Sequence, residues 1–166
     1  MTLSPLQLRS YFIPEFSYSA NQEFVQPQSN EIIANTDFLS VTFTSGPMVD
    51  NEHKWQIDLH VGSLENARNL LPYCFSIRVL GFFEVQDDYF KTQTPEKIKQ
   101  LVNVNGTSIL YSAAREYLLL TTSRGPLPPM VLPSLSFINF ALIEQPSKQK
   151  KSEVTKPSKK PVKKSR

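Results

Sequence analysis

The residues of this chain that are best suited to chemistry are two histidines and one cysteine. His53 and His60 are candidates for a general base or a metal ligand, and Cys74 is a candidate nucleophile. Neither histidine belongs to an H-E-x-x-H, C-x-x-C or G-x-S-x-G motif, and the five glycines are isolated, so no phosphate-binding loop is present. The sequence therefore predicts no catalytic, metal or cofactor site, and we expect a protein that is not an enzyme.

Positive charge is concentrated at the C-terminal end of the chain. Residues 148–166 carry nine Lys and Arg against one acid, or +8, whereas residues 1–147 carry nine against fourteen, or −5. Lys, Pro and Ser dominate this end, and such a composition cannot bury enough apolar surface to offset the entropy lost on ordering. We therefore predict a folded domain over residues 1–146 and a disordered basic tail over residues 147–166.

The tail has two readings, and the sequence leaves both open. A run of lysines binds polyanions such as nucleic acid or anionic lipid headgroups, but it also keeps a protein soluble without any partner. The candidate residues for a polyanion contact are Lys150, Lys151, Lys159, Lys160, Lys163 and Lys164.

The lone cysteine excludes an internal disulfide and suits a reducing compartment. The N-terminal residues lack the basic start and apolar run of a secretory signal, and no stretch approaches 18 consecutive apolar residues. We therefore expect a cytoplasmic protein.

Four segments alternate apolar and polar residues with the period of a β-strand. They run from Leu6 to Tyr18, from Leu39 to Thr44, from Trp55 to Val61 and from Tyr73 to Val85. Pro14 predicts an edge or a bulge in the first, Gly46 and Pro47 predict a turn after the second, and Gly81 predicts a bulge in the fourth. One apolar face on each strand predicts an antiparallel sheet that is covered on one side.

After Tyr89 the period changes to that of a helix. Thr94 and Pro95 predict a helix start, Asn105 and Gly106 predict an interruption, and a longer helix is expected from Thr107 or Ser108 to Arg124, before Gly125. Its apolar residues cover more than one stripe, which favours contacts on two sides. The order of strands followed by helices indicates an α+β fold, with a four-stranded antiparallel sheet and helices on one face.

A Pro-rich apolar stretch, residues 126–133, follows the long helix and cannot form a helix or a central strand. Ser134 then predicts the cap of a final short helix that reaches about Glu144, with Leu135, Ile138 and Leu142 at helical spacing.

Three motifs in this region together resemble the SecB family of export chaperones. They are S-I-L-Y-S-A-A-R-E at 108–116, S-R-G at 123–125 and L-P-P-M-V-L-P at 127–133, followed by Phe137. The resemblance extends over roughly residues 5–144 and includes the order of the four strands.

The resemblance implies a homotetramer, built as a dimer of dimers, that binds unfolded polypeptide clients in long apolar grooves. The residues that match the family's motifs, and are therefore the candidate groove residues, are Leu110, Tyr111, Leu127, Met130, Leu132 and Phe137. Family members that deliver clients to the SecA motor carry acids on the exposed sheet face. Here Glu15 matches one such acid, whereas Ser19 and Ser76 stand near the places of others.

Two functions from different classes follow. The first is an ATP-independent holdase that serves protein export, with SecA as partner, or protects a dedicated client such as an antitoxin. The second is a polyanion-binding adaptor that its basic tail attaches to nucleic acid or to an anionic membrane.

Overall fold

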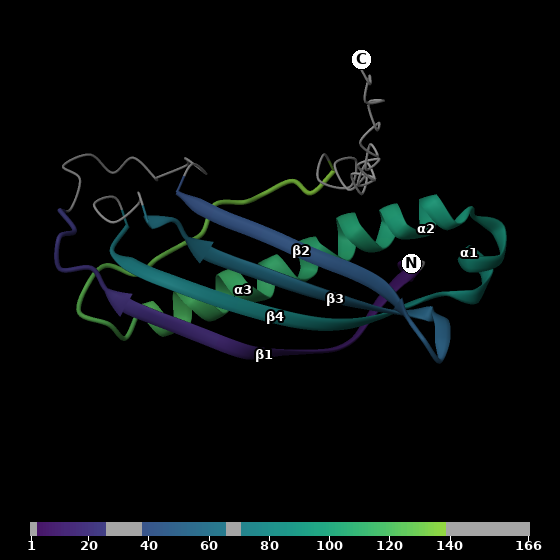
Figure 1. Ribbon diagram of the computed structural model, residues 1–166, viewed down its shortest axis with the longest axis horizontal. Helices are drawn as coiled ribbons and strands as arrows, with labels where there is room; N and C mark the ends of the chain where they lie inside the picture. The colour runs from purple at the N-terminus through teal and green to yellow at the C-terminus, as the bar shows by residue number, and fades with distance from the viewer. Residues whose placement is uncertain (1–2, 26–37, 66–70, 139–166) are drawn as a thin grey trace, which may run out of the picture.

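The fold is a twisted sheet of four antiparallel strands with its helices on one face (Figure 1). The computed structural model describes residues 3–25, 38–65 and 71–138. The strands are β1 (Leu6–Ala20), β2 (Leu39–Met48), β3 (Asn51–Ser63) and β4 (Tyr73–Val85), in the sheet order β1-β4-β3-β2. The predicted four-stranded antiparallel sheet is confirmed, and β1 and β2 form its two edges.

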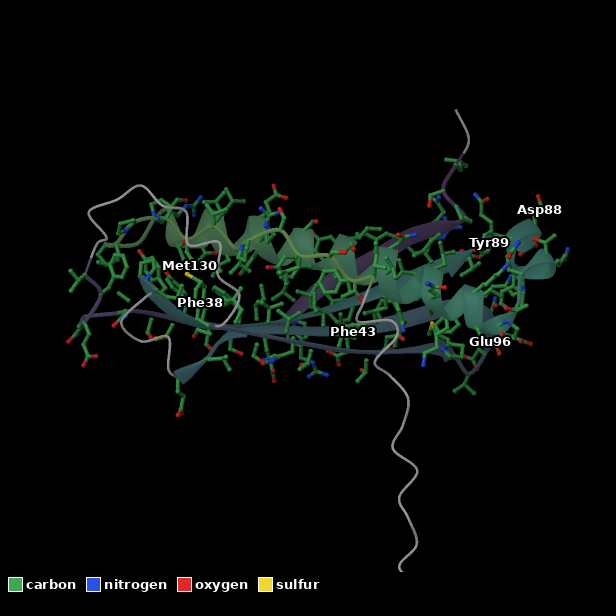
Figure 2. The ribbon with its side chains drawn as sticks, turned by 90° about the horizontal axis from the view of Figure 1, so that it is seen from above. Phe38, Phe43, Asp88, Tyr89, Glu96 and Met130 are labelled. Carbon is green, nitrogen blue, oxygen red and sulfur yellow. The ribbon has the colours of Figure 1, made fainter. Side chains whose placement is uncertain are left out.

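The core lies on the helix side of the two central strands. Ile57, Leu59 and Val61 of β3 are fully buried there, and β4 alternates buried and half-buried residues along its whole length. This alternation arises because successive side chains of a strand point to opposite faces. The opposite face carries the polar residues and faces solvent (Figure 2).

Two predicted strand features differ from the structure. Gly46 and Pro47 do not form a turn, because β2 continues to Met48 and pairs Pro47 with Trp55. An edge strand tolerates Pro, since no second neighbour needs its missing N–H group. Gly81 does not form a bulge either; it pairs in register with Tyr11 and Ile57. Its missing side chain instead leaves room for Leu110, whose Cδ2 would lie 2.5 Å from an added Cβ.

The pairing of β1 with β4 shifts between Leu8 and Ser10 and again between Phe12 and Glu15, and the pairing of β2 with β3 shifts between Pro47 and Met48. The second shift contains Pro14, so the predicted edge position and bulge at this residue are confirmed.

Within residues 71–138, three α-helices follow the sheet: α1 (Asp87–Thr92), α2 (Pro95–Leu101) and α3 (Thr107–Thr122). Thr94 caps α2 by accepting a hydrogen bond from the Lys97 amide, as predicted. The helical structure is not interrupted at Asn105 and Gly106, because a π-helical turn over Val102–Gly106 joins α2 to α3 in one continuous helical segment (Figure 1). Gly106 allows this helical segment to approach the sheet closely, since an added Cβ would overlap Cδ1 of Ile57.

After α3 the chain turns back and runs beside the helix in an extended form (Figure 1). We call residues 126–138 the Pro-rich segment. The final helix predicted to begin at Ser134 is absent from residues 134–137, which have no helical structure; its remainder, residues 139–144, lies outside the described residues. None of the helices in the described part of the chain is long and apolar enough to cross a membrane.

Candidate polypeptide-binding surface

The Pro-rich segment packs against α3 and the sheet through alternate side chains. Met130, Leu132 and Phe137 are buried, whereas Val131 and Ile138 are exposed. Met130 lies between the helix and the sheet (Figure 2). Such alternation is typical of an extended chain that lies on an apolar surface, with one set of side chains inside and the other outside.

Side chains of β4 and α3 hold the start of this segment by its backbone. The Tyr73 hydroxyl donates to the carbonyl oxygen of Leu127 and accepts from the amide of the same residue, each across 2.9 Å. The Thr122 hydroxyl accepts a hydrogen bond from the Met130 amide at 3.0 Å. Tyr73 and Thr122 are themselves buried, so these contacts are shielded from water.

Two further turns of α3 hold the next part of the segment in the same way. Arg115 Nε donates to the carbonyl oxygen of Leu132, and the Tyr111 hydroxyl donates to that of Pro133, both at 2.9 Å. Burial raises the pKa of Tyr111 to about 12, so its hydroxyl keeps the proton that it donates. Residues 111, 115 and 122 lie along one side of the helix and bind backbone groups, which every polypeptide has.

Aromatic rings close the far end of this interface. The ring of Phe137 stands edge-on to those of Tyr111 and Phe43, with centroids 5.6 and 6.4 Å apart. Phe43 belongs to the edge strand β2, so the segment bridges α3 and this edge of the sheet.

The structure brings the six predicted groove residues together, but as an interface within the chain. Leu110 and Tyr111 of α3 and Met130, Leu132 and Phe137 of the segment are all buried, and only Leu127 is partly exposed. In the described chain, the segment itself therefore covers the α3 surface that these residues line. The six tail lysines that were predicted to contact a polyanion lie outside the described residues.

Accessible apolar surface lies beside this interface, along β2. Leu39, Val41 and Phe43 point to the helix side and are half-buried, and Val131 and Ile138 present their side chains outward from the segment. Within the described ranges, no strand pairs with the outer edge of β2, and residues 39–46 include no charge and no Pro to protect it.

A second apolar surface lies on the opposite flank, along α3 and β1. Ile109, Tyr117 and Leu120 are exposed on the outer side of α3, which confirms that the apolar residues of this helix point in two directions. Tyr117 stacks edge-on to Phe16 of β1, with ring centroids 5.0 Å apart. The aromatic residues of β1 were assigned to a strand, but the sequence did not indicate which side they face.

The solvent face of the sheet carries paired charges. Arg78 binds Asp58 with two parallel hydrogen bonds, Nε to Oδ1 at 2.9 Å and Nη2 to Oδ2 at 2.6 Å, and this contact lowers the pKa of the Asp58 carboxyl. On the same face, His60 Nε2 lies 2.9 Å from the Ser76 hydroxyl. Both residues lie on the central strands of the sheet, β3 and β4.

The comparison with known proteins finds relatives along nearly the whole chain. The protein-export protein SecB of Wolbachia pipientis subsp. Culex pipiens (strain wPip) is 22% identical over 163 residues, which covers 92% of this chain and 95% of the relative. The protein-export protein SecB of Wolbachia sp. subsp. Brugia malayi (strain TRS) is 23% identical, with the same coverage. No family model matches the chain.

Among solved structures, the chain is similar to the Mycobacterium tuberculosis Rv1957 SecB-like chaperone in complex with a ChAD peptide from the Rv1956 HigA1 antitoxin. The TM-score is 0.48 and the identity 19%, covering 80% of this chain and 91% of that one.

Proposed function

Because this chain belongs to the SecB family, we propose that it is a molecular chaperone that holds unfolded polypeptides without ATP. The observation that carries this proposal is the way in which the chain binds its own Pro-rich segment. Tyr111, Arg115 and Thr122 bind the backbone of an extended stretch, while apolar side chains of that stretch enter the core. Backbone hydrogen bonds combined with apolar burial, at about 25 cal/mol per Å², select extended apolar chains of many sequences.

The proposed client groove lies between the outer side of the Pro-rich segment and the edge of β2. Leu39, Val41 and Phe43 form its floor, and Val131 and Ile138 form its wall. An extended client can add to the edge of β2 that no strand of the described residues pairs, and place alternate side chains against this wall. Five of the six groove residues predicted from the sequence pack in the core beneath this wall and support it. The sixth, Leu127, is partly exposed and can contact the client.

The homotetramer, a dimer of dimers, remains a proposal, and the opposite flank supports it. Ile109, Tyr117 and Leu120 form an exposed apolar row on α3, beside the edge strand β1. A monomer rarely leaves such a row next to a sheet edge uncovered, because both favour association. Assembly through this flank leaves the β2 flank free for clients.

Protein export is the proposed role, because the curated relatives are protein-export proteins. Protection of a dedicated client, such as an antitoxin, is the alternative role within the same family. The solvent face of the sheet is the surface relevant to SecA as a partner. At its centre Arg78 neutralises the charge of Asp58. Serines also stand near two of the positions where exporting members carry acids. We therefore expect this face to bind SecA weakly.

Light scattering from an aggregating client tests the chaperone function. A chemically unfolded protein is diluted into buffer with and without the full chain at one tetramer per client, and suppressed scattering is the expected result. Exchanging both Val131 and Ile138 for Glu should raise the amount needed for half-maximal suppression at least tenfold, since two lost apolar contacts at roughly 1 kcal/mol each cost about 2 kcal/mol together, and about 1.4 kcal/mol is a factor of ten. Val49→Glu is the matched control, because Val49 is fully exposed in the hairpin after β2. Unchanged scattering with the wild-type chain would refute the proposal.

The assembly is tested separately by solution mass. Leu120→Glu places a charge in the α3 row, where the side chain is 59% exposed, so the monomer should fold normally while the mass of the assembly falls. A wild-type monomer, or a mass that Leu120→Glu leaves unchanged, would contradict assembly through this flank.

The charge of the tail supports the second candidate function, contact with a polyanion. Nine Lys and Arg within residues 148–166 would make binding to duplex DNA or to anionic vesicles weaken steeply with salt. Exchanging Lys159, Lys160, Lys163 and Lys164 for Glu should abolish this binding and leave the suppression of scattering unchanged. Salt-independent binding would reject the role.

A further inference from the structure

A cavity of about 440 Å³ lies at the end of the molecule where the β2–β3 hairpin meets α1 and α2. It is separate from the proposed client groove. Its apolar lining residues are Pro47 of β2, Trp55 of β3, Phe90 of α1, and Pro95 and Ile98 of α2. Grooves lined by aromatic side chains, such as Trp55 and Phe90 here, bind Pro-rich segments in the polyproline II conformation.

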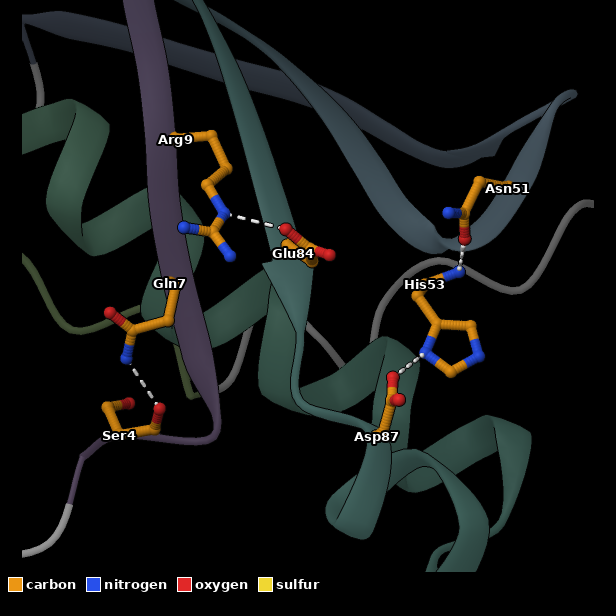
Figure 3. A network of polar contacts seen from close by, with 7 residues as sticks. All are labelled: Ser4, Gln7, Arg9, Asn51, His53, Glu84 and Asp87. Carbon is orange, nitrogen blue, oxygen red and sulfur yellow. Dashed lines mark hydrogen bonds and ion pairs between the residues drawn. The ribbon is translucent and has the colours of Figure 1, made fainter.

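Contacts between the hairpin and α1 hold one wall of this cavity in place. The imidazole of His53 stacks on the ring of Phe90, with centroids 4.0 Å apart. Its Nδ1 lies 2.9 Å from Asp87 Oδ1 (Figure 3). The side-chain oxygen of Asn51 accepts a hydrogen bond from the backbone amide of His53 at 2.9 Å (Figure 3). The cavity is therefore present before any ligand enters.

Trp55 provides a hydrogen-bond donor that is not satisfied. Its side chain lines the cavity, the residue is only 8% exposed, and its indole nitrogen has no hydrogen-bond partner among the described residues. A buried N–H without an acceptor is costly and uncommon. An occupant that offers a backbone carbonyl oxygen to this group would remove that cost.

The charged residues at the cavity favour a basic occupant. Glu52 and Glu96 contribute two carboxylates, and Lys99 contributes one ammonium group. The lining therefore has a negative balance, and an occupant that combines proline with lysine would match both its apolar part and its charge.

We propose that this cavity binds residues 156–164 of the same chain, K-P-S-K-K-P-V-K-K. In a polyproline II conformation Pro157 and Pro161 would lie about 12 Å apart, at 3.1 Å per residue, and flanking lysines would reach the two carboxylates. The segment thereby covers the apolar lining and supplies a carbonyl group to Trp55.

The chain is long enough, and its described part ends near the cavity. Phe137 contacts Phe43, and Pro47 of the cavity lies four residues further along β2, about 13 Å at 3.3 Å per residue. Eighteen residues separate Ile138 from Pro157. Fully extended, they span at most roughly 60 Å, so a connection within one chain is several times longer than required.

Trp55 is the only tryptophan of the chain, so its fluorescence reports on this cavity alone. In the full chain, exchanging both Pro157 and Pro161 for Ala should shift the Trp55 emission to longer wavelength, because water replaces the segment. Pro146→Ala, outside the segment, is the matched control and should leave the emission unchanged. Exchanging Lys159 and Lys160 for Glu should shift it as well, whereas the same charge change at Lys150 and Lys151 should not.

A labelled peptide of residues 154–166 tests the same contact by fluorescence anisotropy. It should bind the Pro157, Pro161 double variant at least tenfold more tightly than the wild-type chain, in which the attached segment competes at an effective concentration of about millimolar. Adding Trp55→Phe to the double variant keeps an aromatic side chain, although a smaller one, and removes the N–H group, and should weaken binding of the peptide about fivefold. Circular dichroism checks that each variant is folded.

Several results would overturn the proposal. These are identical Trp55 emission in the wild type and the double proline variant, equal shifts from the two lysine exchanges, or equal affinity of the peptide for both chains. An emission shift that depends on protein concentration would assign the cavity to the segment of a second copy and would refute docking within one chain. Because none of these measurements uses an unfolded client, their failure leaves the chaperone function untouched.

Discussion

The hydroxyl of Tyr111 donates a hydrogen bond to the carbonyl oxygen of Pro133, 2.9 Å away and 22 residues later in the chain. Both residues belong to motifs that resemble the SecB family, one in the long helix and one in the Pro-rich stretch after it. Their contact shows that the two motifs form one structural unit, in which the helix holds an extended backbone.

Tyr111→Phe should lower the free energy of unfolding by about 1 kcal/mol, because the part-buried carbonyl group of Pro133 loses its donor. Hydrogen exchange should become faster at the amides of Leu127 and Met130, which Tyr73 and Thr122 hold in the segment, while urea unfolding gives the stability. Tyr89→Phe is a suitable control, since the Tyr89 hydroxyl has no hydrogen bond among the described residues. Equal stability of both variants would show that the contact does not hold the segment.

Alkaline pH should destabilise the protein through the same side chain. Burial raises the pKa of Tyr111 to about 12 from an ordinary value near 10, so the unfolded chain loses this proton first. The protonated Tyr111 side chain therefore contributes its full amount to the free energy of unfolding below pH 10. This contribution is lost as the pH rises toward 12, and the total loss is roughly 2–3 kcal/mol. Urea unfolding between pH 9 and 12 should show a steeper decline for the wild type than for Tyr111→Phe. Parallel declines would contradict the assignment.

Gly125→Ala should destabilise the end of α3 by about 1–3 kcal/mol, as overpacking in a core does. An added Cβ would overlap the phenol of Tyr73, which is fully buried. The Tyr73 hydroxyl makes hydrogen bonds with both the carbonyl oxygen and the amide of Leu127, so the ring cannot easily move away. Gly46→Ala is the matched control, because nothing lies within 4 Å of a Cβ at that position. Thermal unfolding compares the two, and an equal midpoint for Gly125→Ala and the wild type would exclude this packing role.

The Asp58–Arg78 pair should stabilise the sheet above about pH 4 and lose its effect in acid. The hydrogen bond from Arg78 lowers the pKa of the Asp58 carboxyl, so its contribution is present above the ordinary pKa and disappears as the pH falls through the lowered one. The difference in Tm between the wild type and Asp58→Asn should therefore be larger at pH 5 than at pH 2. A difference that does not change with pH would argue against the pair.

The alternation of residues was sufficient to predict the four strands, because one buried face leaves a strong signal of period two. The prediction failed where tertiary contacts set the structure. Gly81 and Gly106 were read as a bulge and a break, yet both are sites where a helix approaches the sheet closely. Helix α1 was missed because six residues are too few to show a helical period, although Asp87 and Asp88 at its start were a signal for its N-terminus.

The candidate groove shows a different limit. The sequence identified an apolar set in α3 and the Pro-rich segment, but an apolar residue that faces a client looks the same as one that faces its own chain. Leu132 and Phe137 were predicted to line a groove, and in the described chain they pack against other residues of the core. The spacing of Leu135 and Ile138 is that of a helix, yet residues 134–137 are not helical. Hydrogen bonds from Tyr111 and Arg115 to the carbonyl groups of Pro133 and Leu132 hold the preceding stretch extended.

The π-helical turn between α2 and α3 has a rotational consequence. Ile98 and Leu110 are twelve positions apart, so a regular α-helix would place them about 120° apart around its axis, at 100° per residue. The wider turn absorbs roughly one residue and reduces this offset to about 20°, so both side chains reach the same core. The turn thus corrects the angular position of the apolar side chains around the helix axis. A chain that is one residue shorter at this point would present the same apolar side from a regular α-helix.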